Sequence, residues 1–142
     1  AGYYAQEHEG ITGGRSLLDH MRDQADLGDE HLRALIGMFG LSGDKAFQDA
    51  ATLSGGEKTK LALAQLVGGR HNLLLLDEPT NNLDPMSRTA TGAALASWPG
   101  TMIVVSHDVE FVEALAPDRV LLMPEGQLDY FSPELVDLVA LA

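Results

Sequence analysis

The chain has 142 residues, which is enough for one hydrophobic core and too few for two ordinary domains, so we expect one domain or part of one. Asp and Glu number 21 against 9 Lys and Arg, and the formal net charge of -12 would repel a phosphate backbone, which argues against direct nucleic-acid binding. The sequence has no cysteine, no signal-peptide pattern and no apolar run near the roughly 18–20 residues that span a bilayer, so we expect a cytoplasmic protein without membrane insertion.

The first half of the chain is predicted to be mostly helical after a short opening strand. Residues 2–6 are β-prone, and a glycine-rich turn over residues 10–14 follows. Residues 54–69 have the pattern of a longer helix that ends at paired glycines. Between residues 15 and 50, apolar side chains at helical spacing predict two or three short helices, the first stripe being Leu17, Leu18 and Met21 and the second Leu32, Leu35, Ile36 and Phe39.

The second half of the chain changes to strand patterns. Residues 73–76 and 102–105 are short continuous apolar runs, typical of strands in a parallel sheet covered on both faces, and a helix-like stretch follows each run. Residues 119–123 and 127–131 flank a Pro-Glu-Gly turn, which predicts a hairpin or an edge-strand pair. A last helix is expected over residues 132–142, with proline in its first turn. The pattern predicts an α/β fold with a mostly parallel sheet and flanking helices.

Ser54, Gly55, Gly56 and Glu57 stand at the predicted start of the helix over residues 54–69. The two glycines let backbone amides approach a ligand closely, and a helix start adds unpaired N–H groups and the positive end of the helix dipole. These features indicate an anion site suited to a terminal phosphate. The same residues also form an S-x-x-E capping box, so the motif alone does not separate the two roles.

Two carboxylates, Asp77 and Glu78, directly follow the apolar run over residues 73–76. Ligands bind at the carboxyl ends of strands in open α/β sheets, so Asp77 is placed to hold Mg²⁺ and Glu78 to orient and deprotonate a water that attacks the terminal phosphorus. The alternative is an acidic turn after a core strand. His107 follows the next apolar strand, so we expect it beside Glu78, where a neutral imidazole could hydrogen-bond the phosphate or the water.

Other polar residues lie near these motifs with weaker signals. Gln6 would end the opening strand, where its amide could reach both the metal and the water. Asp84 precedes a proline, so capping of the next helix is its simpler role. Asn81 and Asn82 in the same turn could cap that helix or touch a second subunit. No function is assigned to His8, His20, His31 or His71.

Taken together, these motifs resemble an ABC ATPase domain. Gln6, residues 53–57, the Asp77 and Glu78 pair, Asp84 and His107 occur in the order and approximate spacing of that family's Q-loop, signature motif, Walker B, D-loop and H-switch. The Glu at position 57 where transporters usually have Gln, the continuation over residues 58–63 and the stretch over residues 80–84 resemble the ABC-F group. These are soluble proteins with two ATPase domains on one chain, and many of them act on ribosomes.

The resemblance implies a partial P-loop NTPase domain, with a helical subdomain over about residues 15–52 and the signature helix and catalytic core over residues 53–142. Residues 54–57 and Asp84 would contact ATP bound on an opposite ATPase domain. Gln6, Asp77, Glu78 and His107 would serve ATP and Mg²⁺ on their own domain. ATP would close the pair of domains and hydrolysis would reopen it. Asn82 stands where many ABC-F members have His.

The sequence lacks G-x-x-x-x-G-K-[ST], the loop that cradles nucleotide phosphates in P-loop enzymes. We therefore expect a fragment, the C-terminal part of the second ATPase domain of an ABC-F protein. Alone it should neither bind ATP tightly nor hydrolyse it, because Glu78 has no nucleotide held in place. It should also self-associate, because the absent strand would expose an edge and apolar surface.

The expected function is an ATP-driven conformational switch in translation or antibiotic resistance, with the ribosome contacted by segments outside these residues. One alternative is the ATP-binding subunit of an ABC membrane transporter, which would dock on membrane-embedded helices through residues 15–50. Another is the head domain of a DNA-repair or chromosome-organising ATPase, although the chain has no heptad run. A non-enzymatic alternative is a degenerate segment that survives as an interaction module.

Overall fold

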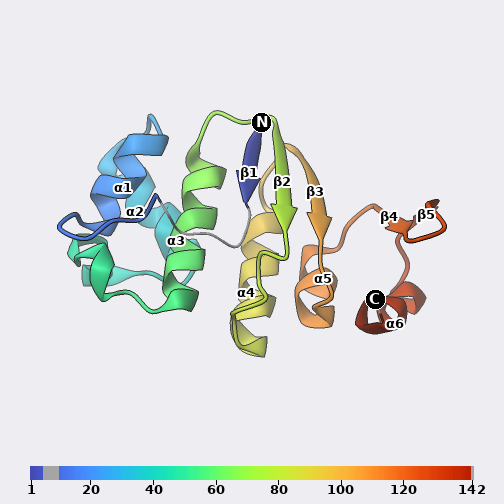
Figure 1. The fold of residues 1–142 in the computed structure, drawn as a ribbon. Helices are drawn as coiled ribbons and strands as arrows, with labels where there is room; N and C mark the ends of the chain where they lie inside the picture. The colour runs from blue at the N-terminus through green and yellow to red at the C-terminus, as the bar shows by residue number, and fades with distance from the viewer. Residues whose placement is uncertain (5–9, 142) are drawn as a thin grey trace.

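A parallel sheet of three strands lies in the middle of the molecule, between a helical part and a small hairpin (Figure 1). The structure is a computed structural model and describes residues 1–4 and 10–141. The sheet is formed by β1 (Gly2–Tyr4), β2 (Leu73–Asp77) and β3 (Thr101–Val105), with β2 in the centre and all neighbours parallel. The predicted α/β fold with a parallel sheet is confirmed.

The helical part holds two α-helices and two short 3-10 helices. Helix α1 spans Leu17–Gln24, helix α2 spans Asp29–Met38, and the 3-10 helices span Gly43–Phe47 and Ala50–Thr52. The predicted apolar stripes are buried, except that Leu35 is only partly buried. The expected two or three short helices are therefore confirmed.

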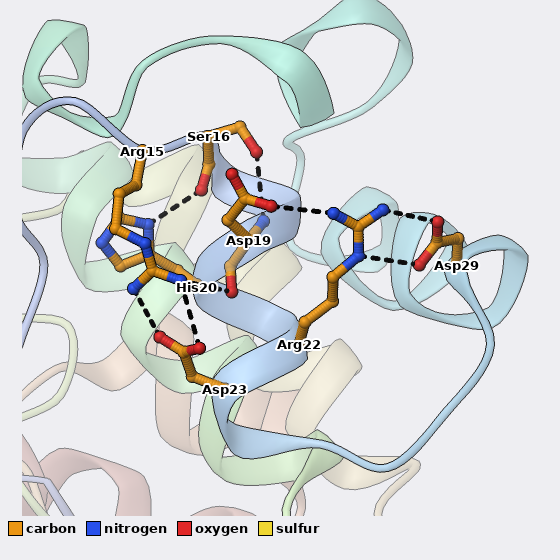
Figure 2. A network of polar contacts seen from close by, with 7 residues as sticks. All are labelled: Arg15, Ser16, Asp19, His20, Arg22, Asp23 and Asp29. Carbon is orange, nitrogen blue, oxygen red and sulfur yellow. Dashed lines mark hydrogen bonds and ion pairs between the residues drawn. The ribbon is translucent and has the colours of Figure 1, made fainter.

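His20 of α1 is buried, and its ring lies beside Ser16 at the start of the helix (Figure 2). Its Nδ1 lies 2.8 Å from the backbone oxygen of Ser16, and its Nε2 lies 3.0 Å from the backbone nitrogen of Thr12. Since the Thr12 N–H must donate, Nε2 accepts and the proton is on Nδ1, which makes the ring neutral. Both ring nitrogens are occupied, so the ring joins α1 to the preceding turn.

The arginines on α1 and before it are paired with aspartates at the surface. Arg15 contacts Asp23, and Arg22 lies between Asp19 and Asp29 at 2.7 and 2.6 Å (Figure 2). Exposed ion pairs of this kind contribute little to stability, since water and salt screen them. Because each arginine offsets the charge of an aspartate, the surface over α1 is less negative than its number of aspartates alone suggests.

Helix α3 (Gly55–Gly68) lies between the helical part and the sheet (Figure 1). It packs against α1, α2 and β1, and its buried side chains include Leu61, Leu63 and Ala64. Ser54 is its N-cap and Gly69 its C-cap, which confirms the helix predicted over residues 54–69.

The two faces of the sheet differ in burial. Leu74 and Leu76 of β2 point into the core, whereas Ile103 and Val105 of β3 are 58% and 54% exposed. Tyr3 and Ile103 are exposed on either side of Leu75, with which both pair and which is half-buried, so an apolar row extends across the three strands. The expectation that the strands are covered on both faces is wrong for β3, because no described element packs on this face.

Helices α4 (Pro85–Ala96) and α5 (Val109–Leu115) pack closely against each other. Their close approach depends on Gly92, where an added Cβ would lie 2.6 Å from the backbone oxygen of Phe111. The Phe111 side chain is fully buried. The helices predicted after residues 73–76 and 102–105 are thus confirmed.

The C-terminal part forms a separate antiparallel hairpin of β4 (Arg119–Leu122) and β5 (Gln127–Tyr130), which confirms the predicted hairpin. The last helix is shorter than predicted, because a 3-10 turn over Pro133–Leu135 precedes α6 (Val136–Leu141). Within residues 1–4 and 10–141, no helix is long and apolar enough to cross a membrane.

Candidate functional site

The carboxyl edge of the sheet brings Asp77, Glu78 and His107 together. Asp77 is the last residue of β2 and is exposed, and Glu78 follows it. His107 follows β3, and its Nε2 lies 2.9 Å from Glu78 Oε1. Because β2 and β3 are parallel and adjacent, side chains far apart in sequence meet at one edge. The predicted placement of His107 beside Glu78 is confirmed.

The backbone of Glu78 is held in an unusual conformation. Its φ is 48°, in the left-handed region that non-glycine residues rarely adopt. The Glu78 N–H donates to the backbone oxygen of Val105 at 2.9 Å, so the turn after β2 is tied to the end of β3. Strain of this kind persists only where the surroundings over-determine it, and it clusters at functional sites. The backbone conformation of Glu78 and its hydrogen bond to Val105 therefore fix the position of this residue at the edge of the sheet.

The electrostatics of Glu78 suit proton transfer. Burial raises the pKa of its carboxyl above the ordinary value, and the charges of Asp108 and Asp77 act in the same direction. His107 acts against this shift through its charge and its backbone N–H. The Glu78 side chain is 16% exposed against 51% for His107, so the acid is sheltered while the imidazole faces solvent. A carboxyl with a raised pKa is better able to accept a proton from water near neutral pH.

The second group of candidates lies at the start of α3. Ser54 Oγ accepts from the Glu57 N–H at 3.1 Å, and Glu57 Oε1 accepts from the Ser54 N–H at 3.1 Å, so the capping box is present. The other oxygen of Glu57 lies 2.5 Å from Lys45 Nζ. These contacts lower the pKa of Glu57, the Lys45 hydrogen bond being the largest cause. Glu57 thereby joins the signature loop to the helical part.

A hollow of about 380 Å³ lies where this loop meets the start of α4. Asp84, the N-cap of α4, accepts from the Ser87 N–H at 2.8 Å, which confirms its capping role. The backbone N–H of Ser87 lowers the pKa of Asp84, and Lys60 lowers it further by its charge. The lining is mostly polar: Ser54, Gly56, Glu57, Lys60, Asn82, Leu83, Asp84 and Ser87. The hollow therefore holds one lysine and two carboxylates, and the backbone N–H groups of Ser54, Glu57 and Ser87 are bonded to the cap side chains.

A hydrogen bond joins α3 to the turn after β2. The Thr59 hydroxyl donates to Asn82 Oδ1 at 3.0 Å and accepts from the Tyr4 hydroxyl at 3.3 Å. Thr59 and Tyr4 are buried, so their hydrogen bond is shielded from water, whereas Asn82 is exposed. Asn82, for which capping or a second-subunit contact was expected, binds the signature helix of its own chain.

The structure thus forms two groups, one at the sheet edge and one around the hollow. Gln6 lies outside the described residues, so its predicted place remains a prediction. Sequence reasoning missed Lys60, although its spacing of three from Glu57 puts both on one side of α3. It also missed the contacts that Asp108 makes with Thr80 and Arg88, which no local pattern indicates. Within the described ranges 1–4 and 10–141, no cluster of three or more His, Cys, Asp or Glu side chains could hold a metal by itself.

The fold and the two groups define an ATP-binding cassette. The chain belongs to the ABC transporter family, whose family model matches residues 2–81, more than half of the chain. Residues 54–57, Asp77 and Glu78 fall within the matched part.

Curated relatives confirm the resemblance to the ABC-F group. ATP-binding protein YdiF of Bacillus subtilis (strain 168) is 40% identical over 131 residues, covering 92% of this chain and 20% of YdiF. ATP-binding protein YheS of Escherichia coli (strain K12) is 38% identical over 138 residues, covering 96% and 22%. ATP-binding cassette sub-family F member 3 of Mus musculus is 37% identical over 119 residues, covering 82% and 17%. The chain spans about a fifth of the length of these relatives.

Solved structures confirm the fold. The dimeric bacterial ABC transporter cassette MJ0796 superposes with a TM-score of 0.74 at 18% identity, over 92% of this chain and 62% of that one. The archaeal ribosome recycling factor aABCE1, solved in complex with the ribosomal stalk protein aP1, gives a TM-score of 0.69 at 20% identity, over 92% and 26%. At these identities the likeness supports the cassette fold alone.

Proposed function

We propose that this chain supplies the catalytic carboxylate and the signature loop of an ABC-F-type ATPase that converts ATP binding and hydrolysis into a conformational change. The observation that carries the proposal is the contact of 2.9 Å between His107 Nε2 and the sheltered Glu78 carboxylate at the carboxyl edge of the parallel sheet. A carboxylate and an imidazole in contact at the carboxyl ends of parallel strands match what phosphoryl transfer to water requires.

Each group has a separate role in the proposal. Glu78 orients the attacking water and accepts its proton, and His107 holds the terminal phosphate or that water by a hydrogen bond. Gln6, which lies outside the described residues, is the further residue proposed to bind that water and the metal. At the hollow, residues 54–57 and Asp84 face ATP bound on a second ATPase domain, which supplies the opposing nucleotide. Each site is thus completed by two domains.

Mg²⁺ fits the sheet edge as a metal that comes with the nucleotide. Mg²⁺ is usually bound by one or two carboxylates, with phosphates and waters as the other ligands, so it needs no protein cage. Asp77 is exposed at the end of β2 and offers one such carboxylate, and Gln6 is the second proposed ligand. Bound there, the metal would neutralise charge on the phosphates.

The partners follow from the relatives rather than from a described contact. We propose a cytoplasmic protein in which a second ATPase domain pairs with this one, on the same chain or in a dimer, and the ribosome is the target in translation or antibiotic resistance. The support is the likeness to ABC-F relatives. A transporter subunit is the second candidate, which the description of the matched family favours. Co-purification of the whole protein with ribosomes or with membrane proteins separates the two.

The activity is tested with Glu78→Gln in the whole protein. This change keeps the shape of the side chain and removes the base, so hydrolysis should be lost while ATP binding is retained. The matched control is Glu113→Gln on the exposed side of α5, which should leave both unchanged. Hydrolysis by the Glu78→Gln protein at the wild-type rate would refute the assignment.

The 142 residues alone should neither bind ATP tightly nor turn it over, because the sequence has no phosphate-binding loop to hold the nucleotide against Glu78. A calorimetric titration with Mg-ATP checks this. Micromolar binding would mean that some other element holds the phosphates.

A further inference from the structure

Asp108, the residue after His107, occupies the N-cap of α5 without capping it. Its backbone has the extended conformation of an N-cap, yet its side chain makes no cap hydrogen bond. An Asp in this position ordinarily accepts from an N–H of the first turn and so stabilises its own helix. Its carboxylate, only 13% exposed, is turned instead toward other segments.

The two oxygens of Asp108 bind two segments distant in sequence. Oδ2 accepts a hydrogen bond from the hydroxyl of Thr80, whose residue is fully buried in the turn after β2. Oδ1 lies 3.6 Å from Nη1 of Arg88 on α4. The Asp108 N–H donates to Ser106 Oγ at 3.1 Å, which fixes the turn between β3 and α5. A carboxylate that gives up its own helix cap for these contacts is placed for a different purpose.

We propose that Asp108 is a positioning residue for hydrolysis: by binding Thr80 and Arg88 it holds the turn that carries Glu78 against the turn that carries His107. The inference rests on the proposed ATPase function and deepens it. Thr80 follows Glu78 by two residues and Asp108 directly follows His107, so their hydrogen bond joins the same two turns as the contact between Glu78 and His107.

The contacts of Asp108 with Thr80 and Arg88 are here called the Asp108 clamp. Through Arg88 this clamp is linked to α4, the helix whose N-cap is Asp84. Arg88 also lies 3.9 Å from Glu110, and its Nε is buried with no hydrogen-bond partner in the described part of the chain. The guanidinium is therefore held mainly by charge, with Asp108 as its nearer acid. A movement of α4 at the hollow would act on Asp108 and through it on the His107 turn.

The test uses steady-state hydrolysis by the whole protein, with kcat, KM and ATP affinity measured separately. Thr80→Val removes the hydroxyl at similar volume, whereas Thr80→Ser retains it. We expect kcat to fall on the order of 10²-fold in Asp108→Ala and at least about 10-fold in Thr80→Val, since small misplacements of catalytic groups cost this much. KM and ATP affinity should change less than about twofold, because the clamp acts after binding.

The two variants Thr80→Val and Thr80→Ser keep the test informative if Asp108→Ala does not fold. Thr80→Ser should recover most of the wild-type kcat. The double variant Thr80→Val/Asp108→Ala should have nearly the same kcat as Asp108→Ala, since both substitutions remove the same hydrogen bond. Wild-type kcat in Thr80→Val, or a rise in KM with kcat unchanged, would overturn the clamp. Glu78→Gln is measured beside them: if it remains active, the proposed function fails, and if it alone is inactive, only the clamp fails.

Discussion

Replacement of Glu57 by Gln should make the stability of the chain less dependent on pH. Glu57 Oε1 accepts from the Ser54 N–H, and Oε2 meets Lys45 Nζ at 2.5 Å. A glutamine can keep the first contact through its amide oxygen and loses the charge in the second. The variant therefore separates the ion pair from the helix cap.

The magnitude follows from the exposure of the pair. The Lys45 and Glu57 side chains are 39% and 25% exposed, so solvent screens their attraction and the pair is worth about 0.2–1 kcal/mol. For a chain of this size a loss of ~1 kcal/mol lowers Tm by roughly 2–4 °C. We expect Glu57→Gln to lower the free energy of unfolding by this amount at pH 7.

The pH dependence has a definite sign. Because Lys45 and the Ser54 N–H lower the pKa of Glu57 in the folded state, its stabilising contribution is present above the unfolded pKa near 4.5 and is lost as pH falls through the folded value. The difference between wild type and Glu57→Gln should therefore shrink below pH 4.5. Urea unfolding at pH 7, 5 and 3.5 measures it.

The control is Ser54→Ala, which removes the neutral cap oxygen that accepts from the Glu57 N–H. It should cost about 1 kcal/mol. That cost should change much less with pH than the cost of Glu57→Gln, because the serine oxygen does not titrate. A Glu57→Gln deficit that stays constant from pH 7 to pH 3.5 would refute the reasoning.

Three further predictions concern packing and surface. Gly92→Ala should destabilise the chain by about 1–3 kcal/mol, since the new Cβ would lie 2.6 Å from a backbone oxygen. Gly37→Ala in α2, where no atom would lie nearer than 3.8 Å, should stabilise it by roughly 0.5–1 kcal/mol. Urea unfolding that ranked the two variants the other way would contradict the close packing of α4 on α5. Phe111→Ala should cost about 3–5 kcal/mol in the same assay, because the ring is fully buried; a loss below ~1 kcal/mol would count against that core. The 142-residue chain should self-associate, and Ile103→Lys together with Val105→Lys should reduce its mass in light scattering, while a strictly monomeric wild type would disprove the apolar-face explanation.

Local patterns were sufficient to predict most of the elements and the residue types of the site. Ser54 and Glu57 predicted both the start of α3 and a capping box, because a cap involves only neighbours within one turn. The apolar runs also predicted β2 and β3 from neighbouring residues alone, although one face of β3 is exposed. Asp77 and Glu78 could then be placed at a strand end without knowledge of any neighbour.

Tertiary structure decided which of these groups meet and which elements leave a face uncovered. The contact between Glu78 and His107 exists because β2 and β3 are parallel neighbours, and the exposed face of β3 exists because no described helix packs there. Asp108 illustrates the limit most clearly: it stands at the N-cap of α5, yet its carboxylate binds Thr80 and Arg88. Periodicity and capping are set by residues within one or two turns, whereas the partner of a buried polar group is set by the packing of the whole chain.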